Sequence, residues 1–136
     1  MKDKVLREAG LKVTAPRLLI LQLLEEQHNH LSAEEIHQQL QQAGHEVGAA
    51  TVYRALLQFE QAGLVTRHNF EGDRCVFELE RGEHHDHLVC VQCGRVEEFV
   101  DEMIEARQAH IAKTHQFELT DHTLVIYGKC QACRLA

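Results

Sequence analysis

The chain has 136 residues, which suffices for one medium domain or two small ones. Hydrophobic residues make up 44% of it but aromatic residues only 5%, so any core must be built mainly from Leu, Val, Ile and Ala. No apolar run approaches the roughly 20 residues of a membrane-spanning helix. No apolar segment follows Met1–Lys4, as it would in a secretory signal. We therefore expect a cytoplasmic protein that does not enter the membrane.

The formal net charge of −7 argues against binding of nucleic acid by the chain as a whole. The charges are unevenly distributed, however. Residues 1–24 carry five basic and two acidic side chains, a net charge of +3, whereas residues 83–136 carry five basic and nine acidic ones, a net charge of −4. Contact with phosphate depends on local charge, so the N-terminal part stays compatible with DNA. Eleven histidines are an unusually large share and suggest metal binding.

Capping signals predict four helices in the first 63 residues. Ser32 followed by Glu35 forms a capping box, in which each side chain accepts a hydrogen bond from the backbone N–H of the other residue. Thr14 followed by Pro16 is typical of an N-cap with proline in the first turn. The predicted helices start at Asp3, Thr14, Ser32 and Gly48, and three of them stop at Gly10, Gly44 and Gly63.

After the fourth predicted helix, hydrophobic residues recur at every second position. Leu64–Asn69 and Cys75–Leu79 are predicted to be strands, with a turn at Glu71–Asp73 between them. Three helices followed by a β-hairpin is the order of a winged-helix domain, and the helix before the hairpin is then the recognition helix. The first half of the chain is therefore predicted to bind DNA.

Residues 80–83, Glu-Arg-Gly-Glu, are predicted to form a hinge. We divide the chain into a winged-helix domain at 1–80, a hinge at 81–84 and a second domain at 85–136. The elements predicted in the second domain are strands at His85–Val91, Val96–Phe99 and Leu124–Tyr127, and a helix capped by Asp101 that runs to about Lys113.

Four of the five cysteines form two Cys-x-x-Cys pairs. In a reducing compartment this spacing favours zinc over disulfides. Two such turns can direct four sulfurs at one point, which gives a closed tetrahedral site for structural Zn(II). A redox Cys-x-x-Cys motif is the alternative, but it would need only one pair. The predicted zinc ligands are Cys90, Cys93, Cys130 and Cys133, whereas Cys75 is expected to be a buried strand residue.

The tetrapeptide His84-His-Asp-His87 lies directly before the first cysteine pair. Alternate side chains of a β-strand face opposite sides, so this strand would supply one pair of ligands to each of two metal sites. A solvated strand edge is the simpler alternative. Imidazole and carboxylate ligands suit Fe(II), Mn(II), Co(II) or Zn(II). Residues of the right type to complete the two sites are Glu78, Glu98, Glu105, His110, His115 and His122.

Five segments carry a specific resemblance to a known family. They are Gly10-Leu-Lys-Val-Thr-Ala-Pro-Arg17, Ala50-Thr-Val-Tyr-Arg54, Gly63-Leu-Val-Thr-Arg-His-Asn-Phe-Glu-Gly72, His84-His-Asp-His-Leu-Val-Cys90 and Ile104-Glu-Ala-Arg-Gln108. Together they make the chain similar to the ferric uptake regulator family of bacterial metal-dependent repressors over essentially its whole length. The segment from His68 to Leu79 looks most like the iron-sensing branch of that family.

The resemblance implies a homodimer built from the C-terminal domains, with two winged helices bound to an AT-rich palindrome in double-stranded DNA. It also implies three metal sites in each chain, one of them the structural Zn(II) site at the four paired cysteines. The second site would consist of His84, Asp86, Glu105 and His122. The third would join the two domains through His30, Glu78, His85, His87 and Glu98. His30 is assigned through the resemblance alone.

The resemblance further implies contacts with DNA. Tyr53 and Arg54 on the recognition helix would meet bases in the major groove. Lys12 would reach a narrow AT-rich minor groove, where the negative potential is strongest. Thr51 and Arg17 would hold phosphates. The alternatives are that Tyr53 belongs to the core and that the two basic residues are ordinary surface.

We therefore expect an α+β protein with an N-terminal winged helix-turn-helix DNA-binding domain and a C-terminal α/β dimerisation domain with structural zinc. Its expected function is Fe(II)-dependent repression of iron-uptake genes, with a zinc- or manganese-sensing member of the same family as the alternative. A zinc-dependent enzyme and a metal storage protein are rival classes. The chain lacks the signature of the zinc deaminases, which argues against the enzyme. A metal storage protein would not need a winged helix. Which histidine-carboxylate site senses the metal, and whether dimers pair into tetramers, stay open.

Overall fold

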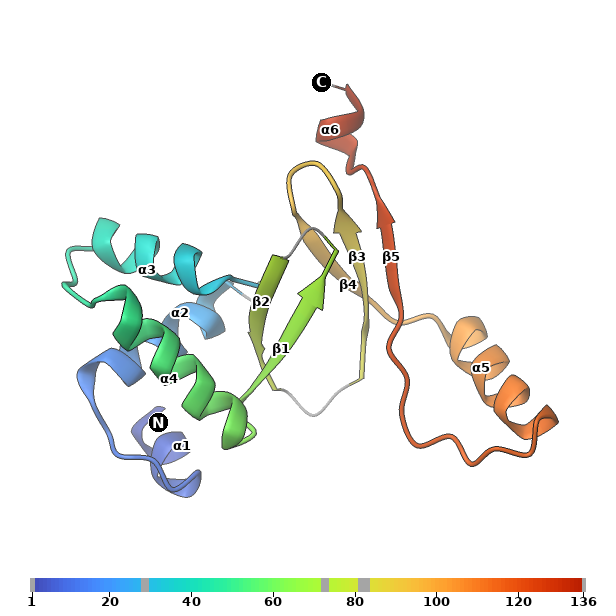
Figure 1. Ribbon diagram of the computed structural model, residues 1–136, viewed down its shortest axis with the longest axis horizontal. Helices are drawn as coiled ribbons and strands as arrows, with labels where there is room; N and C mark the ends of the chain where they lie inside the picture. The colour runs from blue at the N-terminus through green and yellow to red at the C-terminus, as the bar shows by residue number, and fades with distance from the viewer. Residues whose placement is uncertain (1, 28–29, 72–73, 81–83, 136) are drawn as a thin grey trace. The chain divides into compact units, whose positions relative to one another are not determined.

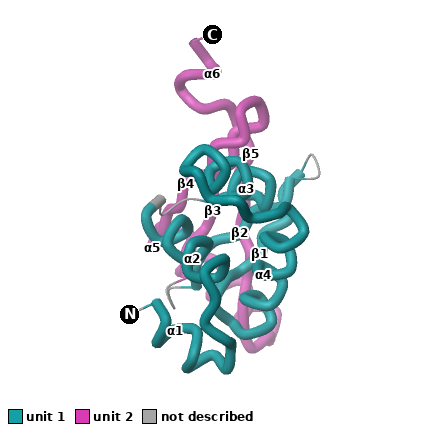
Figure 2. Tube along the Cα trace, turned by 90° about the vertical axis from the view of Figure 1, so that its left-hand side faces the viewer, with its two compact units in different colours: residues 1–82 teal, residues 83–136 magenta. Residues whose placement is uncertain are grey.

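The computed structural model describes residues 2–27, 30–71, 74–80 and 84–135. The chain divides into two compact units, Met1–Gly82 and Glu83–Ala136, which Figure 2 draws in different colours. Residues 72–73 of the predicted turn and 81–83 of the predicted hinge lie outside the described residues. Among the helices that are described, none is long and apolar enough to span a bilayer.

Unit 1 consists of four helices followed by a two-stranded antiparallel sheet (Figure 1). The hairpin follows the last helix directly, as the sequence predicts for a winged helix. Residues Val65 and Leu79 pair at one end of the hairpin, and Phe70 and Arg74 pair at the other. The elements are α1 (Lys2–Glu8), α2 (Ala15–Gln27), α3 (Ala33–Gln42), α4 (Ala49–Gln61), β1 (Val65–Phe70) and β2 (Arg74–Leu79).

Most predicted helix ends agree with the structure. The capping box of α3 is formed, since Glu35 N donates to Ser32 Oγ at 3.1 Å and Ser32 N donates to a Glu35 carboxylate oxygen at 2.9 Å. The C-cap of α4 is Ala62, and Gly63 follows it with a φ of 78°, which glycine adopts without steric penalty. The prediction for Asp3 was wrong, because α1 already begins at Lys2 and Asp3 lies inside its first turn.

The core of unit 1 is aliphatic with two phenylalanines, as the composition requires. Residues from all four helices and from the hairpin contribute to it, among them Leu6, Ile20, Ile36, Phe59 and Phe77. Burying one such side chain contributes roughly 1.5–3 kcal/mol. This core fixes α4 against the other helices and the hairpin, which leaves one face of α4 exposed.

Unit 2 is a three-stranded sheet with two helices. Its strand order is β4-β3-β5, with β3 antiparallel to β4 and parallel to β5, so β5 forms one edge. Figure 1 shows α5 standing away from this sheet. The short helix α6 at the second cysteine pair was not predicted. The elements are β3 (Asp86–Cys90), β4 (Val96–Phe99), α5 (Glu102–Thr114), β5 (Val125–Gly128) and α6 (Gln131–Leu135).

Candidate metal centres and nucleic-acid interface

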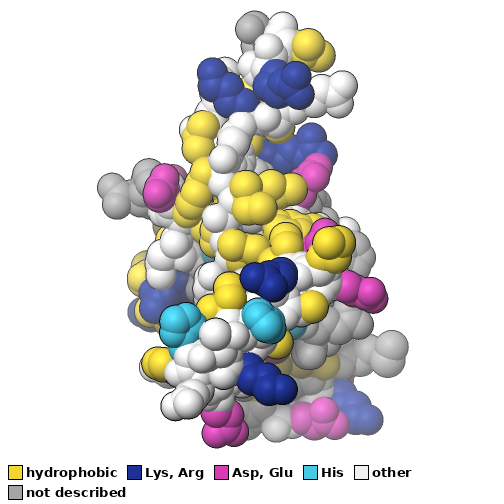
Figure 3. Space-filling view, turned by 90° about the vertical axis from the view of Figure 1, so that its right-hand side faces the viewer, with side chains coloured by type: hydrophobic (Ala, Val, Ile, Leu, Met, Phe, Trp, Pro, Cys, Tyr) yellow, Lys and Arg dark blue, Asp and Glu magenta, His cyan; other side chains and the backbone are white. Residues whose placement is uncertain are grey.

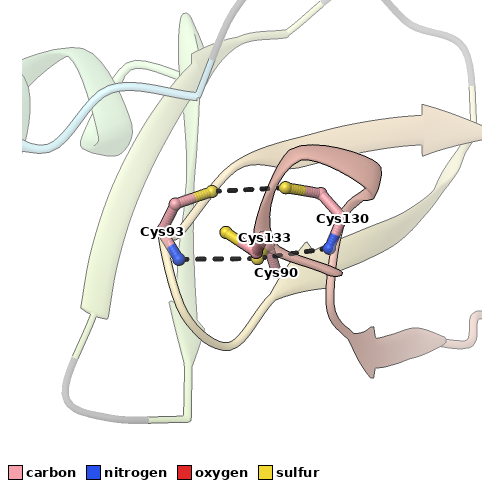
Figure 4. A group of neighbouring side chains, drawn as sticks. All are labelled: Cys90, Cys93, Cys130 and Cys133. Atoms are coloured by element: carbon pink, nitrogen blue, oxygen red, sulfur yellow. Dashed lines mark hydrogen bonds between the residues drawn. The ribbon is translucent and has the colours of Figure 1, made fainter. Parts of the chain in front are cut away.

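The four paired cysteines of unit 2 converge on one point (Figure 4). Their sulfur atoms all lie within 4.8 Å of one another, and the Cys90–Cys133 and Cys93–Cys130 pairs are each separated by 3.7 Å. A tetrahedral zinc ion with bonds of about 2.3 Å holds its four sulfur ligands about 3.8 Å apart. The cluster therefore has the dimensions of a closed zinc site that connects the end of β3 to α6.

Backbone groups prepare one of these sulfurs for metal binding. The N–H groups of Cys130 and Cys93 both point at Cys90 Sγ, at 3.4 Å each, and lower the pKa of the Cys90 thiol to about 5. A hydrogen bond with the Cys130 side chain, together with burial, raises the pKa of Cys133 to about 12. Since zinc binds thiolates, a bound ion would find Cys90 deprotonated and would have to displace the proton of Cys133.

A second cluster in unit 2 brings together two histidines and two carboxylates from three segments. His84 and Asp86 lie at the start of β3, Glu105 lies on the first turns of α5, and His122 lies on the segment before β5. The Nε2 atom of His84 is 3.2 Å from Asp86 Oδ1 and 3.4 Å from Glu105 Oε1. The Nε2 atom of His122 lies 3.5 Å and 3.4 Å from the same two oxygens.

These distances fit a small divalent ion. Nitrogen and oxygen ligands at about 2.1 Å from a tetrahedral ion lie about 3.4 Å apart. Asp86 is only 1% exposed, and its Oδ2 makes no hydrogen bond within the described residues; neither do the buried atoms Glu105 Oε1 and His122 Nε2. A buried polar atom without a hydrogen bond costs about 1–3 kcal/mol, so an ion that ligates these atoms would remove a real penalty.

Unit 1 holds a buried histidine beside a buried glutamate. The segment at Leu31 pairs with Phe77 of β2 through two backbone hydrogen bonds, of 3.1 and 2.8 Å, and this bridge places His30 next to Glu78. His30 Nε2 is 2.9 Å from Glu78 Oε2, and the two side chains are 1% and 5% exposed. Both residues are ligands that the family resemblance implies.

The three remaining residues of that implied set lie together in unit 2. His87 faces Glu98 across the β3–β4 ladder. His85 lies two residues earlier in the chain, with its ring centroid 4.9 Å from that of His87 and its Nε2 3.5 Å from Glu98 Oε1. The structure thus separates His85 and His87 from His84 and Asp86, as strand alternation predicts.

Sequence reasoning assigned no role to His68, yet the structure places it at Glu78. Its Nε2 lies 2.5 Å from Glu78 Oε1. The register of the hairpin carries a signal for this contact, because Thr66 pairs with Glu78 and His68 lies two residues further along the same face. By contrast, the candidates His110 and His115 are exposed, at the C-terminal part of α5 and at its C-cap, and belong to none of the ligand groups among the described residues.

One face of α4 is exposed and polar. Val52, Leu56 and Phe59 are buried, whereas Tyr53 is 46% exposed, so Tyr53 does not belong to the core. Arg54 lies beside Tyr53 on the exposed face and donates to Thr51 Oγ1 at 3.5 Å. The two residues predicted to contact bases are therefore both exposed on α4.

The two other predicted DNA contacts lie next to this helix. Lys12 is exposed in the loop before α2. Arg17 donates to the backbone carbonyl of Lys12 and to Gln58 Oε1 of α4, at 2.6 Å each. The guanidinium group therefore connects the loop to the recognition helix.

Unit 2 also carries a large apolar surface. None of the 13 residues of α5 is buried. Figure 3 shows hydrophobic side chains gathered on the side of unit 2 that carries α5 and β5. Surfaces of this kind are typical of protein–protein contacts. The exposed hydrophobic residues of α5, β5 and the segments next to α5 are Val100, Met103, Ile111, Phe117, Leu119 and Ile126.

The chain is similar to known proteins over almost its whole length. The model of the ferric uptake regulator family matches residues 8–127. The ferric uptake regulation protein of Legionella pneumophila is 62% identical over 134 residues, which is 98% of each chain. The crystal structure of the Vibrio cholerae ferric uptake regulator has a TM-score of 0.89 and 53% identity, covering 96% of this chain and 100% of that one. The Helicobacter pylori regulator, described as having three functional metal binding sites, has a TM-score of 0.85 and 30% identity, covering 96% and 87%.

Proposed function

Because this chain belongs to the ferric uptake regulator family, we propose that it is an Fe(II)-dependent repressor that binds AT-rich palindromic operators of iron-uptake genes as a homodimer. The observation that carries the proposal is the cluster of His84, Asp86, Glu105 and His122, with spacings that fit a divalent ion. It occurs in a chain whose other unit exposes a recognition helix. Such a repressor would act in the cytoplasm, where the bacterial chromosome lies.

The regulatory centre of this proposal is made by ligands from both units. His30 and Glu78 are already in contact within unit 1, and His85, His87 and Glu98 are already grouped within unit 2. When bound, a divalent ion would supply one positive centre that the two groups of ligands share. The ligands of unit 2 would then hold α4 in one orientation, which removes part of the ordering cost of binding DNA.

The acidic balance of the chain gives the regulatory ion a second effect. A protein with a net charge of −7 is repelled by DNA phosphates, and each bound divalent ion adds two positive charges to each chain. Neutralising carboxylates such as Glu78, Glu98 and Glu105 therefore favours DNA binding whatever the orientation of the units.

The homodimer is proposed from the surface of unit 2. Among the described residues β5 lies at the edge of its sheet, and Ile126 on it is 42% exposed. The exposed apolar side chains of α5 would also be covered by a partner surface, since Met103 is 79% and Ile111 51% exposed. A second copy of unit 2 would cover both, in a two-fold arrangement. The four-cysteine centre would bind structural Zn(II) and stabilise this unit.

The rival functions differ in what they require of the metal centres. A zinc enzyme needs an open coordination position and a nearby general base. Four protein donors already complete a tetrahedron at the four-cysteine centre and at the His84–Asp86–Glu105–His122 cluster. A storage protein would have no use for the exposed Tyr53 and Arg54. We therefore propose that the chain is not an enzyme, and that Mn(II) or Zn(II) sensing is the alternative within the family.

The deciding experiment is DNA binding measured by fluorescence anisotropy, with zinc-loaded full-length protein and an AT-rich palindromic duplex under anaerobic conditions. Fe(II), Mn(II) and Zn(II) are titrated separately against a chelator control. We expect tight binding at micromolar Fe(II) or Mn(II) that chelator reverses. A response to trace Zn(II) alone would assign the chain to zinc sensing. Binding that is indifferent to every metal would refute the metal-gated repressor.

A further inference from the structure

His68 and Glu78 form a diagonal pair on one face of the β1–β2 hairpin. Thr66 pairs with Glu78, and His68 pairs with Val76, so the histidine lies one step along the ladder on the same side. Diagonal neighbours of this kind lie about 7–8 Å apart at the backbone, within reach of long side chains. The hairpin geometry therefore delivers an imidazole to the carboxylate of Glu78.

The two carboxylate oxygens of Glu78 have different neighbours. Oε1 lies 2.5 Å from His68 Nε2, and Oε2 lies 2.9 Å from His30 Nε2. Glu78 is only 5% exposed at its side chain and His68 only 17%, so water competes little for this contact. His68 and His30 therefore contact different oxygens of the same carboxylate, with their ring centroids 5.6 Å apart.

We propose that His68 is a positioning residue, which donates its Nε2–H to Glu78 Oε1 and so keeps Oε2 turned towards His30 and the regulatory metal. The inference rests on the proposed function, because it takes Glu78 to be a metal ligand. Carboxylate ligands are commonly held by hydrogen bonds from neighbouring groups that do not touch the metal. Loss of such a group typically weakens metal binding by about 10–100-fold.

The ring of His68 is itself held in place. It stacks on Phe70, two residues further along β1, with ring centroids 5.8 Å apart and an angle of 3° between the planes. Phe70 is 6% exposed and so belongs to the buried part of unit 1. Its ring restricts the rotation of the imidazole, and this restriction makes the direction of the Nε2–H bond definite.

The test separates the hydrogen bond from the packing of the ring. His68→Phe keeps an aromatic ring for Phe70 but removes the donor, whereas His68→Gln keeps a donor and removes the ring. His45→Phe is the matched control, an exposed histidine of the same unit outside the described ligand groups. The zinc-loaded full-length proteins are titrated with Co(II), whose visible spectrum reports both affinity and ligand geometry. Zinc content and thermal unfolding of the cobalt-free proteins are measured alongside.

We expect H68F to weaken Co(II) binding at the regulatory site by about 10–100-fold. H68Q should stay within about threefold of the unsubstituted protein and H45F should equal it, with zinc content unchanged in all three. Unchanged affinity in H68F would overturn the inference. Equal losses in H68F and H68Q, with an altered cobalt spectrum, would make His68 a ligand and overturn it as well. If H68F does not fold, His68→Leu provides the same test without a donor.

Two further variants separate this inference from the function on which it depends. Glu78→Ala and Glu98→Ala remove proposed ligands from unit 1 and unit 2. If both abolish Co(II) binding at the regulatory site while H68F has no effect, only the role of His68 is refuted. If neither alters Co(II) binding, the proposed ligand set itself is refuted, and the inference about His68 with it.

Discussion

Arg17 Nη2 donates a hydrogen bond of 2.6 Å to Gln58 Oε1, which joins the first turn of α2 to the exposed face of α4. The same guanidinium group holds the carbonyl of Lys12 at 2.6 Å. The family resemblance implies a phosphate contact for Arg17. The structure adds a connection between the loop that would enter the minor groove and the helix that would enter the major groove.

Because of this connection we expect Gln58→Leu, a substitution that removes no charge, to lower the affinity for DNA. Loss of the hydrogen bond frees Lys12 and α4 to move independently, and one such bond contributes on the order of 1 kcal/mol, or about fivefold in DNA affinity. The slope of log affinity against log salt should not change in Q58L. In R17Q the affinity should fall as well, and the slope should become shallower by about 1 if Arg17 holds a phosphate. Anisotropy titrations at several salt concentrations distinguish the two, and unchanged affinity in Q58L would disprove the connection.

Arg54→Ala should weaken binding to the operator by about 1–3 kcal/mol, because a bidentate contact with a guanine is lost. Folding should be unaffected, since Arg54 is exposed and its bond to Thr51 is long, at 3.5 Å. Gln61→Ala is the control, an exposed residue at the C-terminal end of the same helix. Affinity is measured for operator and for unrelated DNA. An equal loss for both would show that Arg54 contacts phosphate and not a base.

Zinc affinity at the four-cysteine centre should rise with pH between about 6 and 8. Because the pKa of Cys133 is raised to about 12, its thiol is protonated in the zinc-free form throughout this range, and the proton must leave when zinc binds. The pKa of Cys90 is lowered to about 5, so this residue is already a thiolate and adds no pH dependence. Release of at least one proton implies roughly a tenfold gain in affinity for each pH unit. Competition with a chromophoric chelator measures it, and a flat profile would contradict the proton assignment.

Glu105→Gln should remove one metal ion from each chain and loosen α5. The amide nitrogen is a poor metal ligand, and Glu105 is the residue of α5 that reaches the cluster with His84 and His122. Metal content and amide hydrogen exchange are the measurements. Glu102→Gln is the matched control, since Glu102 lies in the same first turn outside the cluster. Equal exchange of α5 in both variants would show that the cluster does not stabilise this helix.

Glu98→Ala should lower metal-dependent DNA affinity by about 10–100-fold and change the free energy of unfolding by less than about 1 kcal/mol. Glu98 faces His87 across the ladder and lies 3.5 Å from His85, whereas its neighbour Glu97 pairs with Arg95. Glu97→Ala is therefore the matched control. If E98A represses like the unsubstituted protein, with the same metal response, the proposed interdomain site is not the sensor.

Local signals in the sequence predicted most of the elements. The capping box of Ser32 and Glu35, the N-cap at Asp101 and the strand Val96–Phe99 all occur in the structure where the residues place them. Each depends on neighbours within a few positions, where backbone geometry alone decides which groups meet. The error at Asp3 is a shift of one helix end by one or two residues, a position that local signals fix poorly. The missed helix α6 has only five residues.

The metal ligands likewise divide into those that local spacing predicts and those that only the fold brings together. Chain spacing alone was enough to pair the cysteines and to separate His84 and Asp86 from His85 and His87, because a Cys-x-x-Cys turn and the alternation of a strand are local geometry. Spacing could not choose His122 over His110 or His115 to complete a site. That choice depends on where α5 and the segment before β5 lie relative to β3.

The sequence by itself therefore determined most of the elements, the pairing of the four cysteines and the two-sided histidine segment, since all of these follow from interactions between residues near each other in the chain. Only the tertiary structure decided that Arg17 reaches Gln58, that His68 reaches Glu78 and that Glu105 reaches His84. These pairs lie 41, 10 and 21 positions apart in the chain. Packing of the core and the register of the sheets bring them within hydrogen-bonding or ion-pair distance. The hairpin register gives a signal for the contact of His68 with Glu78 alone, and no local pattern encodes the other two.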